Sequence, residues 1–340
     1  MTETMSVSKQ LHDFIDDLEK CIQYEYGSKI DCDNIVLCGM GGSAISGNVV
    51  ADYCLERTNK PVVSIMNTNL PKWANKRTLV IISSYSGNTL ETLESYKHAM
   101  EIGCQRVIIT SGGLLKELAE KNGDPLIMLP GNYHPRHSIG YMIGYIFGVI
   151  KAACPLNIKE EVLKSIDSVR EYRDRLEDRV NSLAMEMARH YIDYIPVICS
   201  YSNIQSIIFR WKTQLNENAK YVAFCTTMSE FVYSDLKGWI NNRRPNYVLT
   251  IIVDNEKMIR DDVYISKLIV YLRDHNVPYH LITLGGKTPM ENMLRALILG
   301  DYISMYMAEL QGIDPSGVPP IDSLKRKLKD LTEERLKDVI

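Results

Sequence analysis

The stretch Cys38-Gly39-Met40-Gly41-Gly42-Ser43-Ala44-Ile45-Ser46-Gly47 decides how the first part of the chain folds. It follows the apolar run 35–37 and precedes a helix-like segment, which predicts a strand, a glycine turn and the start of a helix. Glycines allow a positive φ and a close approach to a ligand, and a helix N-terminus attracts anions through its unpaired N–H groups and its dipole. We therefore expect the ligand of this turn to carry a phosphate group.

The glycine turn alone leaves two kinds of phosphate ligand open. Gly39, Gly41 and Ala44 also match the dinucleotide-binding pattern G-x-G-x-x-G/A, although that pattern is short and weakly specific. The next expected strand, 62–66, is followed by Asn-Thr-Asn at 67–69, without the carboxylate that would bind a ribose. This absence counts against a nicotinamide or flavin cofactor.

A second polar turn follows the expected strand 78–82. It carries the hydroxyl groups of Ser84, Ser86 and Thr89 directly before another helix-like segment, and each hydroxyl can donate to a phosphate oxygen. One phosphate held by hydroxyls and helix N-termini suits a sugar phosphate better than a pyrophosphate. The two turns together therefore favour a sugar phosphate over a dinucleotide.

Length and composition limit the class of protein. A chain of 340 residues suits two α/β domains, and 45% hydrophobic with 24% charged residues is typical of a globular protein. The net charge of -3 provides no basic field for nucleic acid. No apolar run approaches the ~18 residues of a membrane span, and the N-terminus lacks a signal-peptide pattern. We expect a cytoplasmic protein that binds neither nucleic acid nor membrane.

Cysteine and histidine spacing gives little support to a metal site. The eight cysteines form no C-x-x-C pair and fall largely in expected strands and helices, so we interpret them as small buried apolar residues. The histidines include no H-x-x-x-H pair. His134 and His137 are close in sequence, but a polar loop is the favoured interpretation of that segment.

Strand-like and helix-like segments alternate in the first half of the chain. The expected strands are 35–38, 62–66, 78–82, 106–110 and 125–129, and the expected helices are 8–24, 43–57, 88–102, 113–121 and 139–153. Such alternation builds a parallel sheet with helices on both faces, and the ligand site then lies at the carboxyl ends of the strands. Both polar turns fall at those ends.

The second half repeats this architecture after a long charged helix expected at 159–190. Its expected strands are 195–199, 221–224, 248–253 and 280–284. The turn at 200–203 carries hydroxyls but no glycines, so it is a poorer phosphate site than the turns of the first half. We expect one domain at 1–153, which binds the phosphate, and a second at 154–340.

Three charged residues are candidate site residues, and each also has an interpretation without a role in binding or catalysis. Arg136, near a helix start after the fifth expected strand, can bind phosphate or stabilise an oxyanion, or it is a solvated surface residue. Glu217 ends the expected helix 205–220, where the helix dipole disfavours a carboxylate, so it is either a general base or a solvated side chain near Lys220. Lys325 opens the last charged helix, and surface charge is its alternative role.

Together, these segments resemble the archaeal-type bifunctional phosphoglucose/phosphomannose isomerases over nearly the whole chain. The matching parts occur in the family's order, at 39–43, 84–89, 135–136, 216–218 and 300–325. Any one of them would be weak evidence, but five in the same order are strong. The resemblance implies an α/β fold of two sugar-isomerase-type domains, each with a mainly parallel sheet flanked by helices.

The resemblance also implies an activity and roles for particular residues. The activity is the interconversion of glucose 6-phosphate and fructose 6-phosphate, and also of mannose 6-phosphate, with no metal or organic cofactor. Glu217 is then the base that moves a proton between C1 and C2, Arg136 lies near the enediolate, and Lys325 acts at the substrate. Phosphate binding falls to the two polar turns: Gly41, Gly42, Ser43, Ser84, Ser86 and Thr89. The resemblance further implies a homodimer with shared active sites, because the ring-opening segment comes from the partner subunit.

One position departs from the family pattern. In the stretch 230–239, Tyr233 stands where the family carries the histidine that opens the sugar ring. An ordinary tyrosine titrates near pH ~10, so it is a poor proton acceptor at neutral pH, although it can donate a hydrogen bond or relay a proton. Ring opening is then either slower or assisted by Tyr233 with Lys325 or a water. The missing histidine also motivates an alternative, a sugar-phosphate-binding regulatory protein without catalysis. The sequence shows no DNA-binding helix-turn-helix to support that alternative.

Overall fold

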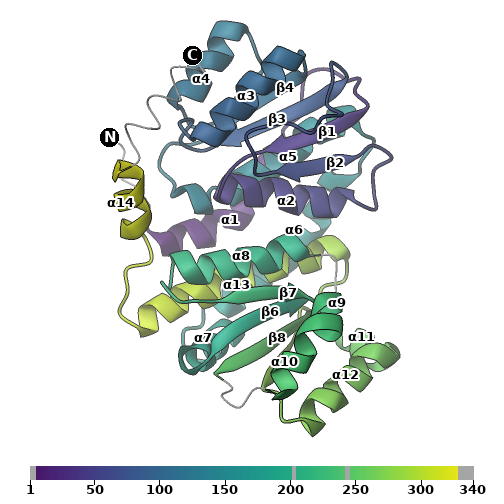
Figure 1. The fold of residues 1–340 in the computed structure, drawn as a ribbon, viewed down its shortest axis with the longest axis vertical. Helices are drawn as coiled ribbons and strands as arrows, with labels where there is room; N and C mark the ends of the chain where they lie inside the picture. The colour runs from purple at the N-terminus through teal and green to yellow at the C-terminus, as the bar shows by residue number, and fades with distance from the viewer. Residues whose placement is uncertain (1–4, 201–203, 242–245, 328–340) are drawn as a thin grey trace. The chain divides into compact units, whose positions relative to one another are not determined.

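The computed structural model describes residues 5–200, 204–241 and 246–327 of the chain (Figure 1). Its contacts divide the chain into two compact units, described separately below: unit 1 is Met1–Leu163 with Val318–Ile340, and unit 2 is Lys164–Gly317. The division at Leu163 falls inside helix α6 (Ile158–Leu176). Because packing alone defines these units, the expected functional domains 1–153 and 154–340 stay a prediction.

Within its described residues, unit 1 contains one five-stranded sheet in which all neighbouring strands are parallel. The strand order is β2-β1-β3-β4-β5, with β1 (Asn34–Cys38), β2 (Val62–Ile65), β3 (Thr78–Ser84), β4 (Gln105–Thr110) and β5 (Leu126–Met128). Strand β3 is buried along its whole length, as expected for a central strand covered on both faces. The predicted parallel sheet and its strands are confirmed, with ends that differ by one or two residues.

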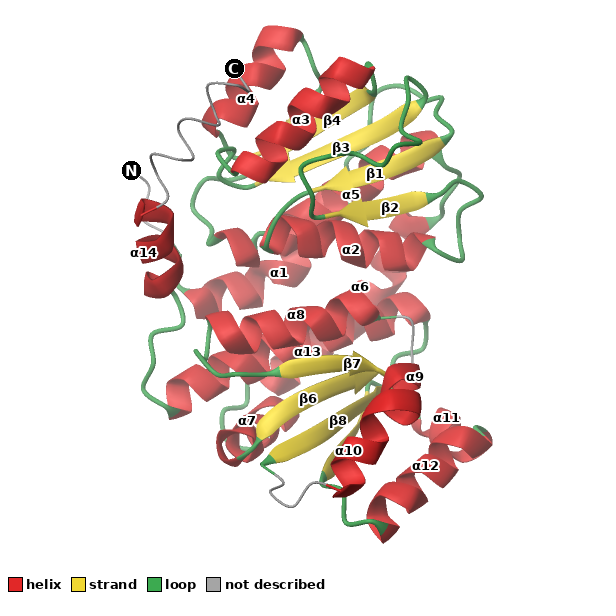
Figure 2. Cartoon of the chain, viewed as in Figure 1, coloured by secondary structure: helices red, strands yellow, loops and turns green. Residues whose placement is uncertain are grey.

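Helices cover both faces of this sheet (Figure 2). They are α1 (Val7–Cys21), α2 (Gly42–Cys54), α3 (Leu90–Ile102), α4 (Gly113–Asn122) and α5 (Ile139–Ala153). Helices α3 and α4 bury Leu93, Tyr96 and Leu115 against Val36 and Val80 of the sheet. Helices α1 and α2 pack on α5 at the other face. The last described helix, α14 (Pro319–Lys327), is also grouped with this unit.

Unit 2 has a second all-parallel sheet, with four strands among the described residues. Its order is β7-β6-β8-β9, with β6 (Ile195–Ser200), β7 (Phe224–Thr227), β8 (Tyr247–Val253) and β9 (Tyr279–Thr283). Apolar side chains from β6 and β8 meet those of the helices on one face to form the core. The predicted repetition of the parallel-sheet architecture is therefore confirmed.

The helices of unit 2 again lie on both faces of its sheet (Figure 2). On one face α7 (Leu183–Asp193) and α8 (Gln205–Glu217) pack on α13 (Pro289–Leu310). On the other lie α9 (Met228–Glu230), a turn of π-helix η2 (Phe231–Asp235), α10 (Leu236–Asn241), α11 (Glu256–Asp261) and α12 (Val263–Asp274). No helix in the described ranges is long and apolar enough to cross a membrane.

Two sequence-based expectations for this half are wrong in detail. The single helix expected at 159–190 is two helices, α6 and α7, because Asp178 accepts hydrogen bonds from the Val180 and Asn181 N–H groups and Ser182 caps α7. The strand expected at 221–224 begins only at Phe224. Its expected start follows Lys220, which adopts a positive φ of 54°.

Candidate functional site

The glycine turn joins β1 to α2 and brings the backbone close to the end of β3. A β carbon at Gly39 would lie 3.0 Å from the Ala44 nitrogen and 3.1 Å from the Ser83 carbonyl oxygen. Gly41 has a φ of +55° and is the N-cap residue of α2, a position from which it offers no capping side chain. The turn therefore presents the start of α2 without a side-chain cap, as an anion-binding helix terminus requires.

The second polar turn gathers hydroxyl groups ahead of α3. The Ser84 hydroxyl donates to Thr89 Oγ1 at 3.3 Å and accepts from the Gly87 N–H at 3.2 Å. The exposed Ser86 accepts from the Asn88 N–H through its hydroxyl oxygen at 3.3 Å. Thr89 is the N-cap residue of α3, but its side chain makes no capping hydrogen bond. Both predicted phosphate turns thus precede helices whose first turns lack a side-chain cap.

Tyr85 connects these two turns to a third segment, a role that the sequence analysis missed. Its N–H donates to Ser43 Oγ at 3.3 Å in the glycine turn. Its hydroxyl donates to the Pro130 carbonyl at 2.7 Å and accepts from the Tyr133 N–H at 2.9 Å. The available sequence signal was a tyrosine between two predicted phosphate-binding serines, and the structure shows that this tyrosine is buried. Tyr85 fixes the loop 130–134 relative to both turns.

Arg136 lies at the end of that loop, on the short 3₁₀ turn η1 (Pro135–His137). A β carbon at Gly42 would lie 2.8 Å from the Arg136 α carbon and 3.0 Å from the Pro135 carbonyl oxygen. Arg136 is only 6% exposed, so the alternative of a solvated surface arginine is wrong. Unit 1 therefore brings together the glycine turn, the hydroxyl turn and Arg136.

The Arg136 loop is also tied to helix α1. The Tyr133 hydroxyl donates to Asp17 Oδ2 at 2.7 Å, and Gln10 Oε1 accepts from the His134 N–H at 2.9 Å. Burial raises the pKa of Asp17 to about 6, against the opposing effect of hydrogen bonds from Tyr133 and Tyr141. The buried Asp17 is a second residue near the site that the sequence analysis missed.

Glu217, the predicted base, is the last residue of α8 and is half-buried. The helix that carries it is fixed to α13 by polar contacts in the core. The Arg210 guanidinium donates to both Asp301 carboxylate oxygens, at 2.9 and 2.8 Å, and the pair is almost fully buried. Next to Glu217, the buried Asn218 donates through Nδ2 to Ser304 Oγ at 3.0 Å. These contacts set the end of α8, and with it the backbone of Glu217.

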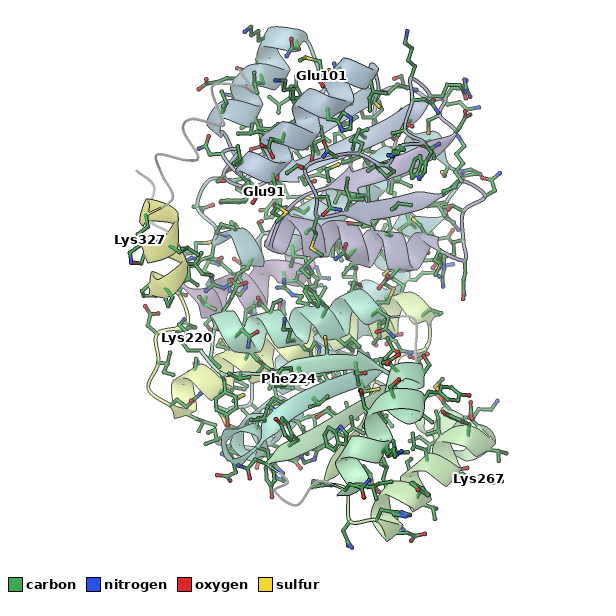
Figure 3. All side chains as sticks on the ribbon, viewed as in Figure 1. Glu91, Glu101, Lys220, Phe224, Lys267 and Lys327 are labelled. Carbon is green, nitrogen blue, oxygen red and sulfur yellow. The ribbon has the colours of Figure 1, made fainter. Side chains whose placement is uncertain are left out.

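Lys220 stabilises the C-terminus of α8, where the helix dipole is negative (Figure 3). Its ammonium group donates to the backbone carbonyls of Glu217 at 2.6 Å, Asn218 at 3.4 Å and Asp314 at 3.1 Å. Lys220 thus bonds directly to the main chain of Glu217. A cation at this end offsets the unfavourable placement of a carboxylate there.

The two other predicted catalytic residues are carried by other elements. Tyr233 is on η2 in unit 2, and 85% of its side chain is exposed. Lys325 is on α14, which is grouped with unit 1, and its side chain lies outside the described part of the structure. Unit 1 thus carries two helix starts without a side-chain cap, and unit 2 carries a partly exposed carboxylate, Glu217, at a helix end.

The chain has the fold of the sugar isomerase (SIS) domain. The chain resembles the crystal structure of tagatose-6-phosphate ketose/aldose isomerase from Escherichia coli, with a TM-score of 0.65 and 18% identity, over 92% of this chain and 90% of that one. A family model, the bacterial phospho-glucose isomerase C-terminal SIS domain, matches residues 180–328.

Full-length relatives identify the family. The bifunctional phosphoglucose/phosphomannose isomerase of Caldicellulosiruptor bescii is 31% identical over 91% of this chain and 96% of its own length. Its counterpart in Aquifex aeolicus is 32% identical over 87% of this chain and 90% of its own length. The chain belongs to the bifunctional phosphoglucose/phosphomannose isomerase family and is an isomerase. The family, the fold and the enzyme class predicted from the sequence are confirmed.

Proposed function

We propose that the protein interconverts glucose 6-phosphate and fructose 6-phosphate through a cis-enediol intermediate, and also acts on mannose 6-phosphate. The observation that carries this proposal is the match to bifunctional isomerases over almost the full length of both chains. A regulatory protein without catalysis has no comparable support. Return of the proton to either face of C2 would yield the glucose or the mannose epimer, so one site can serve both sugars.

In this proposal the phosphate group binds between the two turns of unit 1. The hydroxyls of Ser43, Ser84, Ser86 and Thr89 donate to its oxygens, and the backbone N–H groups at Gly41 and Gly42 face it at the start of α2. The uncapped first turns of α2 and α3 support this role, because their dipoles favour an anion. The phosphate would hold the end of the sugar that does not react.

Glu217 is the proposed general base. Its carboxylate takes the proton from C2 of the open-chain aldose and returns it to C1 of the enediol, while a proton moves from O2 to O1. Arg136 stabilises the negative charge that develops on these oxygens, since its guanidinium stays charged throughout. The buried contacts of Arg210 and Asn218 support a fixed helix end for the base.

We propose further that the enzyme is a homodimer with shared active sites, in which Tyr233 acts on the sugar bound by the partner subunit. The 85% exposed side chain of Tyr233 supports this arrangement, because a phenol that acts on a substrate must be enclosed when it does so. Lys325, on α14, is proposed to act at the same substrate, with Tyr233, during ring opening.

A coupled assay tests the activity. Fructose 6-phosphate and mannose 6-phosphate are supplied separately, with a chelator present, and the formation of glucose 6-phosphate is followed. We expect turnover of both sugars. Saturable binding of both without turnover would instead establish the regulatory alternative.

Mixed dimers test the shared sites. If each site combines Glu217 of one copy with Tyr233 of the other, a dimer of one Glu217→Gln chain and one Tyr233→Asp chain contains one intact site. Co-expression of the two differently tagged chains should then restore isomerase activity in the purified mixed dimer. A mixed dimer no more active than the parent variants would contradict shared sites, and a purely monomeric protein would contradict the dimer.

A further inference from the structure

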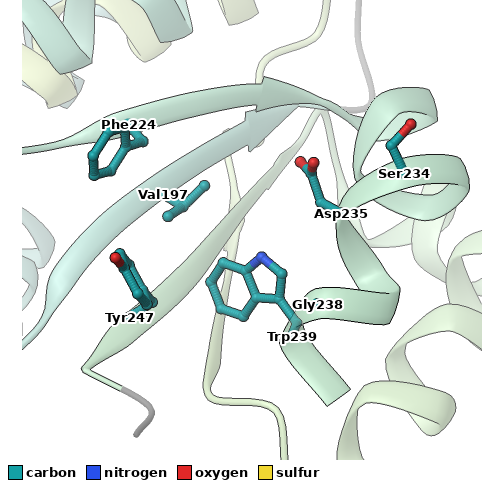
Figure 4. A pocket seen from close by; sticks show the side chains of 7 residues that line it. All are labelled: Val197, Phe224, Ser234, Asp235, Gly238, Trp239 and Tyr247. Atoms are coloured by element: carbon teal, nitrogen blue, oxygen red, sulfur yellow. The ribbon is translucent and has the colours of Figure 1, made fainter. Parts of the chain in front are cut away.

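Unit 2 contains a cavity of about 490 Å³ that the proposed reaction does not use. It lies between the β7 side of the sheet and the segment formed by η2 and α10 (Figure 4). Aromatic rings make up much of its lining, and Asp235 contributes a carboxylate group to it. The volume is in the range of cavities that bind small organic molecules, roughly 300–1,000 Å³.

Three aromatic rings from three different elements border this cavity: Phe224 of β7, Trp239 of α10 and Tyr247 of β8. The ring centroids of Phe224 and Tyr247 are 6.4 Å apart with planes at 59°, and those of Trp239 and Tyr247 are 6.0 Å apart with planes at 55°. The three rings thus form a connected aromatic group at the edge of the cavity. The face of an aromatic ring carries negative potential and attracts a cation.

The carboxylate of Asp235 points toward the space that the rings border (Figure 4). Thr226 donates to Asp235 Oδ2 at 2.9 Å and so fixes one of its two oxygens. Within the described ranges, neither lysine nor arginine forms an ion pair with Asp235. Asp235 also ends the π-helical turn η2, a type of irregularity that often marks functional positions.

From this combination we propose that the cavity is a binding site for a small organic cation, an alkylammonium whose N–H groups donate to Asp235 and whose alkyl part contacts the three rings. A carboxylate that forms no ion pair with any described lysine or arginine favours a positive ligand, and the aromatic faces favour the same sign of charge. An anion would be repelled by Asp235, and a neutral ligand would leave its charge uncompensated. The site lies outside the residues assigned to the isomerase reaction.

Isothermal titration calorimetry with n-butylammonium chloride, in the absence of sugar phosphate, tests the proposal. We expect saturable binding to the full chain, and binding of the neutral 1-pentanol and of butyrate weaker by about tenfold or more. Asp235→Asn should remove the preference for the cation. Glu230→Gln is the matched control, because Glu230 is an exposed carboxylate at the end of α9, directly before η2, and does not line the cavity. This variant should bind the cation as the unmodified protein does.

Trp239→Leu provides an independent variant in case Asp235→Asn folds poorly, and it should weaken binding by about tenfold while leaving Asp235 in place. Equal binding of butylammonium and pentanol would show a merely apolar cavity and overturn the proposal. No saturable binding of the cation, or binding that neither substitution changes, would overturn it as well. Isomerase activity is not the readout, so failure here leaves the proposed function untouched.

Discussion

Gly42 and Arg136 lie so close that a β carbon on Gly42 would be 2.8 Å from the Arg136 α carbon. The proposed mechanism requires the turn that binds the phosphate and the arginine that stabilises the enediolate to lie side by side. This close approach within unit 1 brings the two together. A glycine at position 42 is therefore required by packing against the Arg136 backbone, in addition to any approach of the phosphate.

Gly42→Ala should displace the Arg136 loop, because the new methyl group meets backbone atoms that cannot rotate away. Overpacking of this kind costs about 1–3 kcal/mol. We expect the KM for fructose 6-phosphate to rise at least about tenfold and kcat to fall. Gly131→Ala is the control, since a β carbon there meets nothing within 4 Å. Unchanged kinetics in Gly42→Ala would show that the contact has no bearing on the site.

Tyr85→Phe should weaken the link between the two phosphate turns and the Arg136 loop. The buried Tyr133 N–H loses its acceptor, which costs about 1–3 kcal/mol of stability. Chemical denaturation measures this loss, and steady-state kinetics should show a raised KM. Tyr26→Phe serves for comparison, because no hydrogen bond of its hydroxyl is found in the described residues, and it should change neither quantity. If the variant were as stable and as active as the unmodified protein, the hydroxyl of Tyr85 would have no role in holding the site together.

Asp17 should make stability depend on pH. Its pKa is about 6 in the folded chain and near 3.8 in the unfolded one, so the folded state holds the proton more tightly. Its contribution to stability is therefore present at low pH and is lost as pH rises through 6, by about 3 kcal/mol in total. Asp17→Asn removes this titrating group. The free energy of unfolding of the variant, minus that of the unmodified protein, should therefore be more favourable to the variant at about pH 7.5 than at about pH 4.5.

The comparison uses denaturation at both pH values, with the exposed Asp16→Asn as the control. A difference between Asp17→Asn and the unmodified protein that is the same at both pH values would contradict the raised pKa of Asp17.

Most of the fold was predictable because it depends on local patterns. The alternation of apolar strands with glycine turns and amphipathic helices predicted both parallel sheets, and the glycine turn at 39–47 predicted the start of α2. The break between α6 and α7 was missed because it depends on hydrogen bonds of Asp178 and Ser182, in a charged sequence with helical periodicity throughout.

Less of the site was predictable, because its key contacts join distant parts of the chain. Sequence motifs identified Ser43, Ser84 and Arg136 one by one, but the bonds from Tyr85 to Pro130 and Tyr133 depend on the tertiary fold. The sequence left open whether Arg136 is a site residue or a solvated surface residue. The structure excludes the solvated surface residue, because the Arg136 side chain is buried. The roles of Glu217, Tyr233 and Lys325 in catalysis stay predictions.

Tyr233→Phe should slow ring opening and leave the later steps unchanged. The probe is 5-deoxyfructose 6-phosphate, which lacks the hydroxyl that closes the furanose ring and is therefore always open. We expect kcat for fructose 6-phosphate to fall at least about tenfold, with turnover of the open analogue preserved. Tyr194→Phe, at another exposed tyrosine of unit 2, should affect neither sugar. An equal loss with both sugars would refute a role in ring opening.

The proton transfer assigned to Glu217 is tested most directly by following fructose 6-phosphate in D₂O with Glu217→Gln, alongside Glu186→Gln as an exposed control in the same unit. With Glu217→Gln we expect the isomerisation and the uptake of solvent deuterium at carbon to fall by about a hundredfold or more, while fructose 6-phosphate still binds. Isomerisation and deuterium uptake at the normal rate in that variant would contradict the assignment of the base.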